Sequence, residues 1–197
     1  SYGKTTTKFI LTRILSEKFN VVCTPQSFNT PMGIVRTIRT MLKSQTEIFI
    51  CEMGAKNLGD IKEDCDIANP HYGIITSVGP QHLETFKTVD NVFATKFELA
   101  DEIKKNGGLT FVNGDSKEII NRIGDEFKVY GTDKSFDFCG EDLSYGRNGS
   151  QFTVTLDGKK VPFTTKLLGL HSIIDIIGAV SLAYTLGVPV ADLQYAV

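Results

Sequence analysis

The chain has 197 residues, of which 41% are hydrophobic, 22% charged and 10% aromatic. These fractions are typical of a globular protein and exclude the disordered and fibrous classes. Lys plus Arg total 21 and Asp plus Glu total 23, and the resulting net charge of -2 gives no general reason to bind nucleic acid or an anionic membrane.

Short apolar runs alternate with amphipathic stretches over the first 130 residues. Apolar residues at helical spacing predict helices, and compact runs of β-branched and aromatic residues predict strands. Strands that alternate with helices favour a parallel, doubly wound sheet with helices on both faces. Asp90 is expected to cap the fourth helix. The predicted helices are residues 5–19, 32–42, 59–68, 90–105 and 116–123, and the predicted strands are 20–23, 47–51, 72–78, 109–112 and 127–130.

The pattern changes after Thr132. Residues 136–145, 151–156 and 161–167 alternate as strands do, and Asp157-Gly158 between the last two predicts a hairpin turn. A long helix over 172–186 follows and ends before Gly187 and Pro189. The predicted fold is one α/β domain with a mostly parallel sheet and a small antiparallel β annex.

Gly3-Lys4-Thr5-Thr6 is the second half of a Walker-A phosphate loop, whose first glycine would precede Ser1. Glycine lets backbone amides point at phosphate oxygens, and the N-terminus of the following helix attracts anions. Lys4 would add a positive charge, and the Thr5 hydroxyl could bind Mg²⁺. The motif predicts a sheet of P-loop type; the alternative is a solvated helix start.

Three further residues could act with this loop. Glu52 follows the strand over 47–51, at the edge where α/β sheets bind ligands, and beside a phosphate loop it predicts a Mg²⁺ ligand. An ordinary loop carboxylate is about equally expected. His82 follows the strand over 72–78 and should lie at the same edge, although a lone His is more often structural. Lys96 lies within the helix over 90–105, where a lysine is usually a solvated surface charge.

In combination, these features resemble the ATP-dependent Mur ligases, which build the peptide of bacterial cell-wall precursors. Glu-Met-Gly-Ala is most similar to the member that adds D-alanyl-D-alanine. The resemblance covers essentially all of the chain and corresponds to the central ATP-binding domain, residues 1–197. The N-terminal substrate domain and the C-terminal domain are expected to be absent from it. The similar stretches are residues 1–8, Thr24-Pro25, Phe28-Asn29-Thr30, Glu52-Met53-Gly54-Ala55, residues 76–84, residues 94–98 and Asn113-Gly114-Asp115.

The resemblance implies a two-step ligation. A carboxylate of a UDP-linked muramoyl peptide attacks the γ-phosphate of ATP to give an acyl phosphate, and the amine of D-alanyl-D-alanine then displaces phosphate. It also implies that Thr5 and Glu52 hold one Mg²⁺, that His82 helps to hold a second, and that Lys96 is carbamylated to become a Mg²⁺ ligand. Lys4, His82 and Lys96 are the expected catalytic residues. The expected nucleotide contacts are Gly3, Lys4, Thr5, Thr6, Asn113 and His171.

The chain departs from the family near His171. The family usually has Asn, used around the adenine, at the positions of Ser172 and Asp175. Adenine contacts are therefore not predicted here, and His171 could instead cap the helix. With these two substitutions, a non-catalytic nucleotide-binding relative remains an alternative interpretation. His82 and Lys96 disfavour it.

Another ligase with the same central domain, of the folylpolyglutamate or cyanophycin synthetase type, is the alternative enzyme, and Glu52-Met53-Gly54-Ala55 disfavours it.

No apolar run approaches the ~18 residues of a membrane span, and no cysteines pair in a Cys-x-x-Cys motif. Free thiols in a reducing cytoplasm are therefore expected. The chain is also expected to be a monomer. By itself the chain is expected to lack ligase activity, because two substrates must be positioned against ATP.

Overall fold

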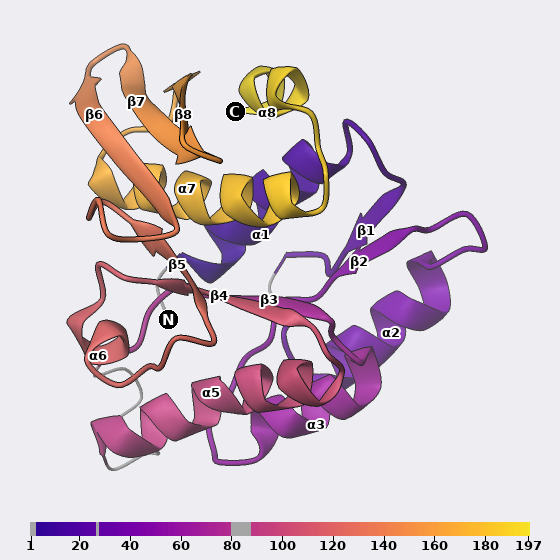
Figure 1. The fold of residues 1–197 in the computed structure, drawn as a ribbon. Helices are drawn as coiled ribbons and strands as arrows, with labels where there is room; N and C mark the ends of the chain where they lie inside the picture. Colours follow the sequence, from indigo (N-terminus) through magenta and orange to yellow (C-terminus); the bar gives the residue numbers. More distant parts are fainter. Residues whose placement is uncertain (1–2, 27, 80–87) are drawn as a thin grey trace.

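The computed structural model describes residues 3–26, 28–79 and 88–197 (Figure 1). Its strands form two sheets, a parallel pair β1-β2 and a six-stranded sheet of order β3-β4-β5-β6-β7-β8. Strands β3 to β6 are parallel, and β6 to β8 are antiparallel. The strands are β1 (Val21–Cys23), β2 (Ile48–Ile50), β3 (Tyr72–Ile75), β4 (Leu109–Asn113), β5 (Lys128–Gly131), β6 (Phe138–Gly146), β7 (Gly149–Leu156) and β8 (Lys159–Thr165).

Helices cover both faces of the parallel strands, as the sequence predicts. Figure 1 shows α7 and α1 on one side of β3 to β5 and α5 with α3 on the other. The antiparallel strands β6 to β8 wrap the outer side of α7. The helices are α1 (Lys4–Leu15), α2 (Pro31–Met41), α3 (Asp60–Ala68), α5 (Val89–Lys105), α6 (Lys117–Ile120), α7 (Leu170–Thr185) and α8 (Val190–Ala196).

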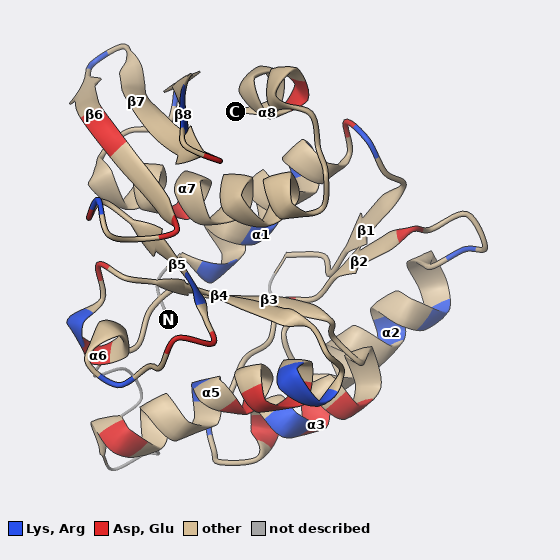
Figure 2. Ribbon diagram, in the orientation of Figure 1, with Lys and Arg blue, Asp and Glu red and all other residues tan. Residues whose placement is uncertain are grey.

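The main core surrounds α7. This helix contacts β4 to β7 on one side and α1 and α8 on others, so it is buried around most of its circumference. Figure 2 accordingly shows α7 almost without charge, whereas the outer helices α3 and α5 carry charges of both signs. A second core lies between α5 and the other face of β3 and β4. Phe111 of β4, fully buried, lies in the first core and Val112 in the second.

The predicted α/β fold with mostly parallel strands and an antiparallel annex is confirmed, but the parallel part is split. β2 and β3 do not pair with each other; both border a cavity of about 720 Å³. The predicted hairpin is also present, since Leu156 pairs with Lys159 across a two-residue turn. Asp157 and Gly158 have φ values of 47° and 74°, and this tight hairpin turn requires both to be positive.

Several predicted helix ends are wrong by a few residues. Thr88, not Asp90, caps α5: its hydroxyl accepts a hydrogen bond from the Asn91 N–H at 3.2 Å. Asp90 lies in the first turn, where it pairs with Arg122 at 2.6 Å. Helix α6 has four residues where eight were expected, and α8 was not predicted. Gly187, with a φ of 82°, ends α7, and the Val188 N–H donates back to the Ala183 carbonyl at 3.1 Å. Pro189 precedes α8, because its fixed φ suits the start of a helix.

All four cysteines are free thiols, as expected: Cys65 and Cys139 are buried, and Cys23 and Cys51 are half-buried. Within the described residues, none of the helices is long and apolar enough to cross a lipid bilayer.

Candidate phosphate and metal site

The glycine before α1 has the backbone geometry that a phosphate loop needs. Gly3 has a φ of 86°, and its carbonyl accepts the first helical hydrogen bond, from the Thr7 N–H at 2.7 Å. A Cβ at this position would lie 2.5 Å from Asp175 Oδ1, so a side chain is excluded by space as well as by φ. The N-terminal turn of α1, with Lys4, Thr5 and Thr6, therefore begins beside a carboxylate of α7.

Glu52 lies at the carboxyl end of β2 and is only 6% exposed. Its backbone N–H donates to the hydroxyl of Thr24, which follows β1, so the paired strands fix its position. Its carboxylate accepts hydrogen bonds from the Thr5 hydroxyl at 2.9 and 3.1 Å and from the Asn29 amide at 3.3 Å. The predicted partners Thr5 and Glu52 are thus in direct contact.

A close approach of two loops holds this carboxylate. The Gly54 N–H donates to the Asn29 carbonyl at 2.9 Å, and a Cβ on Gly54 would lie 2.8 Å from that oxygen. Glycine therefore lets the Asn29 side chain reach Glu52. This close contact explains why a glycine stands at the third position of Glu-Met-Gly-Ala in this chain.

Sequence reasoning missed Lys8, which forms an ion pair with Glu52. The Lys8 Nζ lies 3.1 Å from Glu52 Oε2 and also donates to the Gln26 carbonyl. Lys8 is only 4% exposed, unlike most lysines. The signal that could have found it is its spacing: Lys8 follows Lys4 by four residues, so both lie on one face of α1.

Lys96 is at the position that its helical spacing predicts. Phe97 and Ala100 are buried, and Lys96 lies half-buried at the margin of that stripe, where its Nζ donates to the Ser77 carbonyl at 2.7 Å. Ser77 follows β3, so the side chain reaches the expected sheet edge. Burial, with a smaller contribution from the charge of Lys4, lowers the pKa of Lys96 to about 8. A substantial neutral fraction at mildly alkaline pH follows.

Asn113 and His171 occupy different surroundings. Asn113 ends β4, and its amide donates to the Thr76 carbonyl at 2.9 Å while its oxygen accepts from the Asp115 N–H. It links the ends of two neighbouring strands. His171 is exposed in the first turn of α7, whose N-cap is Gly169, so the alternative that His171 caps this helix is wrong.

Asp175 lies one turn after His171 and faces Gly3. Burial raises the pKa of its carboxyl to about 6, against weaker opposing effects of the Thr7 hydroxyl and of His171. A carboxylate that faces a phosphate loop would repel a phosphate when ionised. The sequence flagged this position as a departure from the family, but not its contact with Gly3.

A metal ion could be held by the residues that the structure brings together. Mg²⁺ prefers oxygen ligands, and the Thr5 hydroxyl and the Glu52 carboxylate supply them side by side. The carboxylate already attracts a cation, the Lys8 ammonium. In the described part of the chain, no group of three or more His, Cys, Asp and Glu side chains could hold a metal. His82, the expected second-metal residue, lies outside the described residues.

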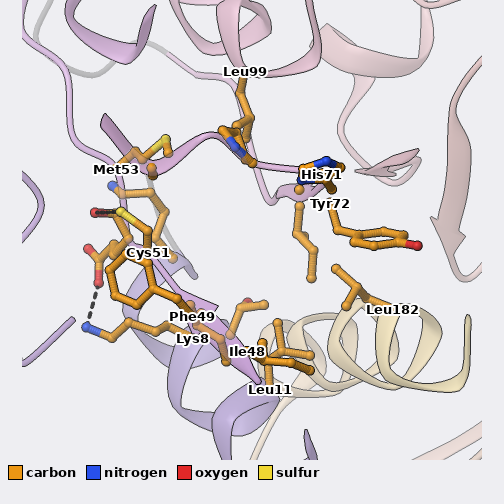
Figure 3. A pocket seen from close by; sticks show the side chains of 18 of the residues that line it. Lys8, Leu11, Ile48, Phe49, Cys51, Met53, His71, Tyr72, Leu99 and Leu182 are labelled. Atoms are coloured by element: carbon orange, nitrogen blue, oxygen red, sulfur yellow. Dashed lines mark hydrogen bonds and ion pairs between the residues drawn. The ribbon is translucent and has the colours of Figure 1, made fainter. Parts of the chain in front are cut away.

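The cavity between the two sheets opens onto these residues. It is lined by the whole of residues 47–53 and 68–77, and therefore by the facing edges of β2 and β3. Lys4, Glu52, Lys96 and Ser77 line its polar part, and apolar side chains of β2, β3, α1 and α7 line the rest. Figure 3 shows Lys8 reaching a carboxylate beside Cys51, while Leu11 and Leu182 face the apolar part.

Comparisons with known proteins agree on one family. Residues 1–183 match the model of the Mur ligase middle domain. The UDP-N-acetylmuramoyl-tripeptide–D-alanyl-D-alanine ligase of Bacillus subtilis is 29% identical over 192 residues, and that of Synechocystis is 30% identical over 199. Each match covers 98% of this chain and 41% of the relative. The chain thus spans about two fifths of the length of these relatives.

A solved structure has the same fold. The MurF ligase from Thermotoga maritima, crystallised in complex with ADP, superposes with a TM-score of 0.87 at 28% sequence identity. The superposition covers 98% of this chain and 46% of that one.

Proposed function

Because this chain belongs to the Mur ligase middle-domain family, we propose that it is the ATP-binding domain of a ligase that joins D-alanyl-D-alanine to a UDP-linked muramoyl peptide. The curated relatives that match 98% of the chain carry this activity in their names. The observation that carries the proposal is the contact of Thr5 with Glu52 at the start of α1. Regions that bind the peptide and the dipeptide are proposed to lie outside residues 1–197.

The described residues have distinct roles in the proposed reaction. The peptide carboxylate attacks the γ-phosphate of ATP to form an acyl phosphate and ADP, and the incoming amine then displaces phosphate to form the amide. Gly3, Lys4 and Thr6 bind the phosphates at the N-terminus of α1. Thr5 and Glu52 would hold Mg²⁺, which would neutralise charge on the phosphates. Two anionic groups meet in the first step, so this positive charge lowers the barrier.

Lys96 is proposed to be a carbamate in the active enzyme. Its neutral amine would add to CO₂ and release a proton, giving an anionic oxygen ligand for a second Mg²⁺. The lowered pKa supports this, because only the neutral amine reacts. His82 is proposed as a further ligand of that ion on the family resemblance alone. Asn113 positions the edge that carries Ser77, and His171 is proposed to contact the nucleotide from α7.

Calorimetry with Mg-ATP tests the nucleotide site. Lys4→Met should weaken binding at least about tenfold, since a lysine on a phosphate is a strong charge-assisted contact. Glu52→Gln should weaken binding of Mg-ATP while changing that of metal-free ATP little. Lys43→Met is the control, because Lys43 is exposed and follows the C-terminal end of α2. Equal affinities in all four proteins would refute the site.

The ligase activity itself is tested in the full-length protein. Phosphate release should require ATP, a UDP-linked muramoyl tripeptide and D-alanyl-D-alanine together. Release that depends on a folate or on an amino-acid polymer instead would favour the alternative ligases. Binding of Mg-ATP without any release would favour the non-catalytic module.

A further inference from the structure

Lys8 is a buried cation that the proposed reaction does not use. Its side chain is 2% exposed and that of Glu52 is 4% exposed, and the two charged groups lie 3.1 Å apart. Lys8 also donates to the Gln26 carbonyl, so its ammonium is held from two sides. It lies one helical turn beyond Lys4, and its burial separates it from the solvent-facing start of α1. Lys8 is therefore poorly placed to bind a phosphate.

The charge of the Glu52 carboxylate is balanced by Lys8. Oε1 accepts hydrogen bonds from Thr5 and Asn29, and Oε2 accepts one from Thr5 and pairs with Lys8. Thr5 and Asn29 are neutral donors, so the positive charge comes from the lysine. A buried carboxylate without a partner is strongly destabilising, and breaking a buried pair leaves such a charge behind.

We propose that Lys8 is the resident counter-cation of Glu52: it keeps the carboxylate in place without metal and makes Mg²⁺ enter with the nucleotide rather than alone. This inference rests on the proposed metal site of Thr5 and Glu52. A divalent ion beside the same carboxylate would be repelled by the ammonium at short range. The phosphates of the nucleotide supply the extra negative charge that offsets this repulsion.

The hydroxyl of Thr5 allows both states. Without metal it donates its proton to Glu52, as the distances of 2.9 and 3.1 Å indicate. A hydroxyl also carries acceptor lone pairs, so rotation about its C–O bond can turn an oxygen lone pair toward a metal. Lys8 can keep its contact with the Gln26 carbonyl in either state.

Thermal unfolding of the protein with EDTA or with MgCl₂, and without nucleotide, tests this proposal. The wild-type protein should respond weakly to Mg²⁺ alone. Lys8→Met should unfold at a lower temperature in EDTA, recover with Mg²⁺, and show an apparent Mg²⁺ affinity at least about tenfold higher than wild type. Lys8→Arg should behave like wild type because it keeps the charge, and Lys43→Met should too.

A double variant separates the charge effect from packing. In Lys8→Met with Glu52→Gln, the stability lost in EDTA should largely return and the gain in Mg²⁺ affinity should disappear. If Lys8→Met does not fold, Lys8→Gln gives the same comparison. A Mg²⁺ affinity no higher than in wild type would overturn the inference, even with Mg-ATP binding intact. Failure of the wild type to bind Mg-ATP would instead refute the proposed function.

Discussion

Replacing Asp175 by Asn should stabilise the protein at neutral and alkaline pH. Burial raises the pKa of this carboxyl from 3.8 to about 6 in the folded protein. Between these values the unfolded chain has lost the proton and the folded chain still holds it. Stability therefore falls as pH rises from about 4 to about 6, and stays lower above that range.

The size of the effect follows from the same values. A rise from 3.8 to about 6 corresponds to roughly 3 kcal/mol, at ~1.4 kcal/mol per pH unit. Asp175 is only half-buried, so solvent screening reduces this to about 1–2 kcal/mol. Asn has nearly the same shape and no charge. Asp175→Asn should thus raise the free energy of unfolding by about 1–2 kcal/mol at pH 8 and change it little at pH 4.

Urea denaturation at the two pH values measures this difference, and Asp125→Asn, at an exposed aspartate, is the matched control. The same replacement should strengthen ADP binding at pH 8. Asp175 lies beside Gly3 of the phosphate loop, and its negative charge would repel the phosphates of ADP. A change in stability that is equal at both pH values, or a loss at pH 8, would show that the ionised carboxylate is not the cause.

Two further predictions concern Lys96 and Gly3. With ¹³C-bicarbonate, NMR should detect a carbamate signal that is stronger at pH 8.5 than at pH 6.5, because the pKa of Lys96 is about 8. The signal should be absent in Lys96→Met and present in Lys43→Met. Gly3→Ala should lower the free energy of unfolding by about 1 kcal/mol more than Gly158→Ala does. Both glycines have a positive φ, but an added Cβ meets Asp175 only at Gly3. Denaturation in an Asp175→Ala background checks this, and an unchanged excess would contradict it.

The fold class could be predicted because its signals are local. Alternating helical and strand periodicity fixes the order of the elements, and Asp157-Gly158 carries the turn chemistry in two adjacent residues. The split between β2 and β3 could not be predicted, because strand pairing depends on which segments meet in space. The same holds for α8: Pro189 indicates a stop, and packing of Leu193 into the main core decides that a helix follows.

The candidate site was predictable where residue type and strand position coincide. Glu52 at the end of a strand and Thr5 in a glycine-lysine motif were expected to meet, and they do. Lys8 was not predicted, since a lysine near a helix start is usually solvated, and the loop of Gln26 that covers it comes from a distant part of the sequence. The contact of Asp175 with Gly3 likewise arises only when α7 packs against α1.

The cavity between the two sheets also has a consequence for how the molecule behaves in concentrated solution. Within the described residues, β2 and β3 each pair with a strand on one side only, and their other edges face the cavity. Unpaired strand edges are templates for intermolecular β-pairing. An extended apolar segment that pairs with one of these edges could bury side chains against the apolar residues of α1 and α7 that line the cavity. Pairing between copies of the chain should therefore begin at an unpaired strand edge such as that of β2 or β3, and not at the charged helices α3 and α5.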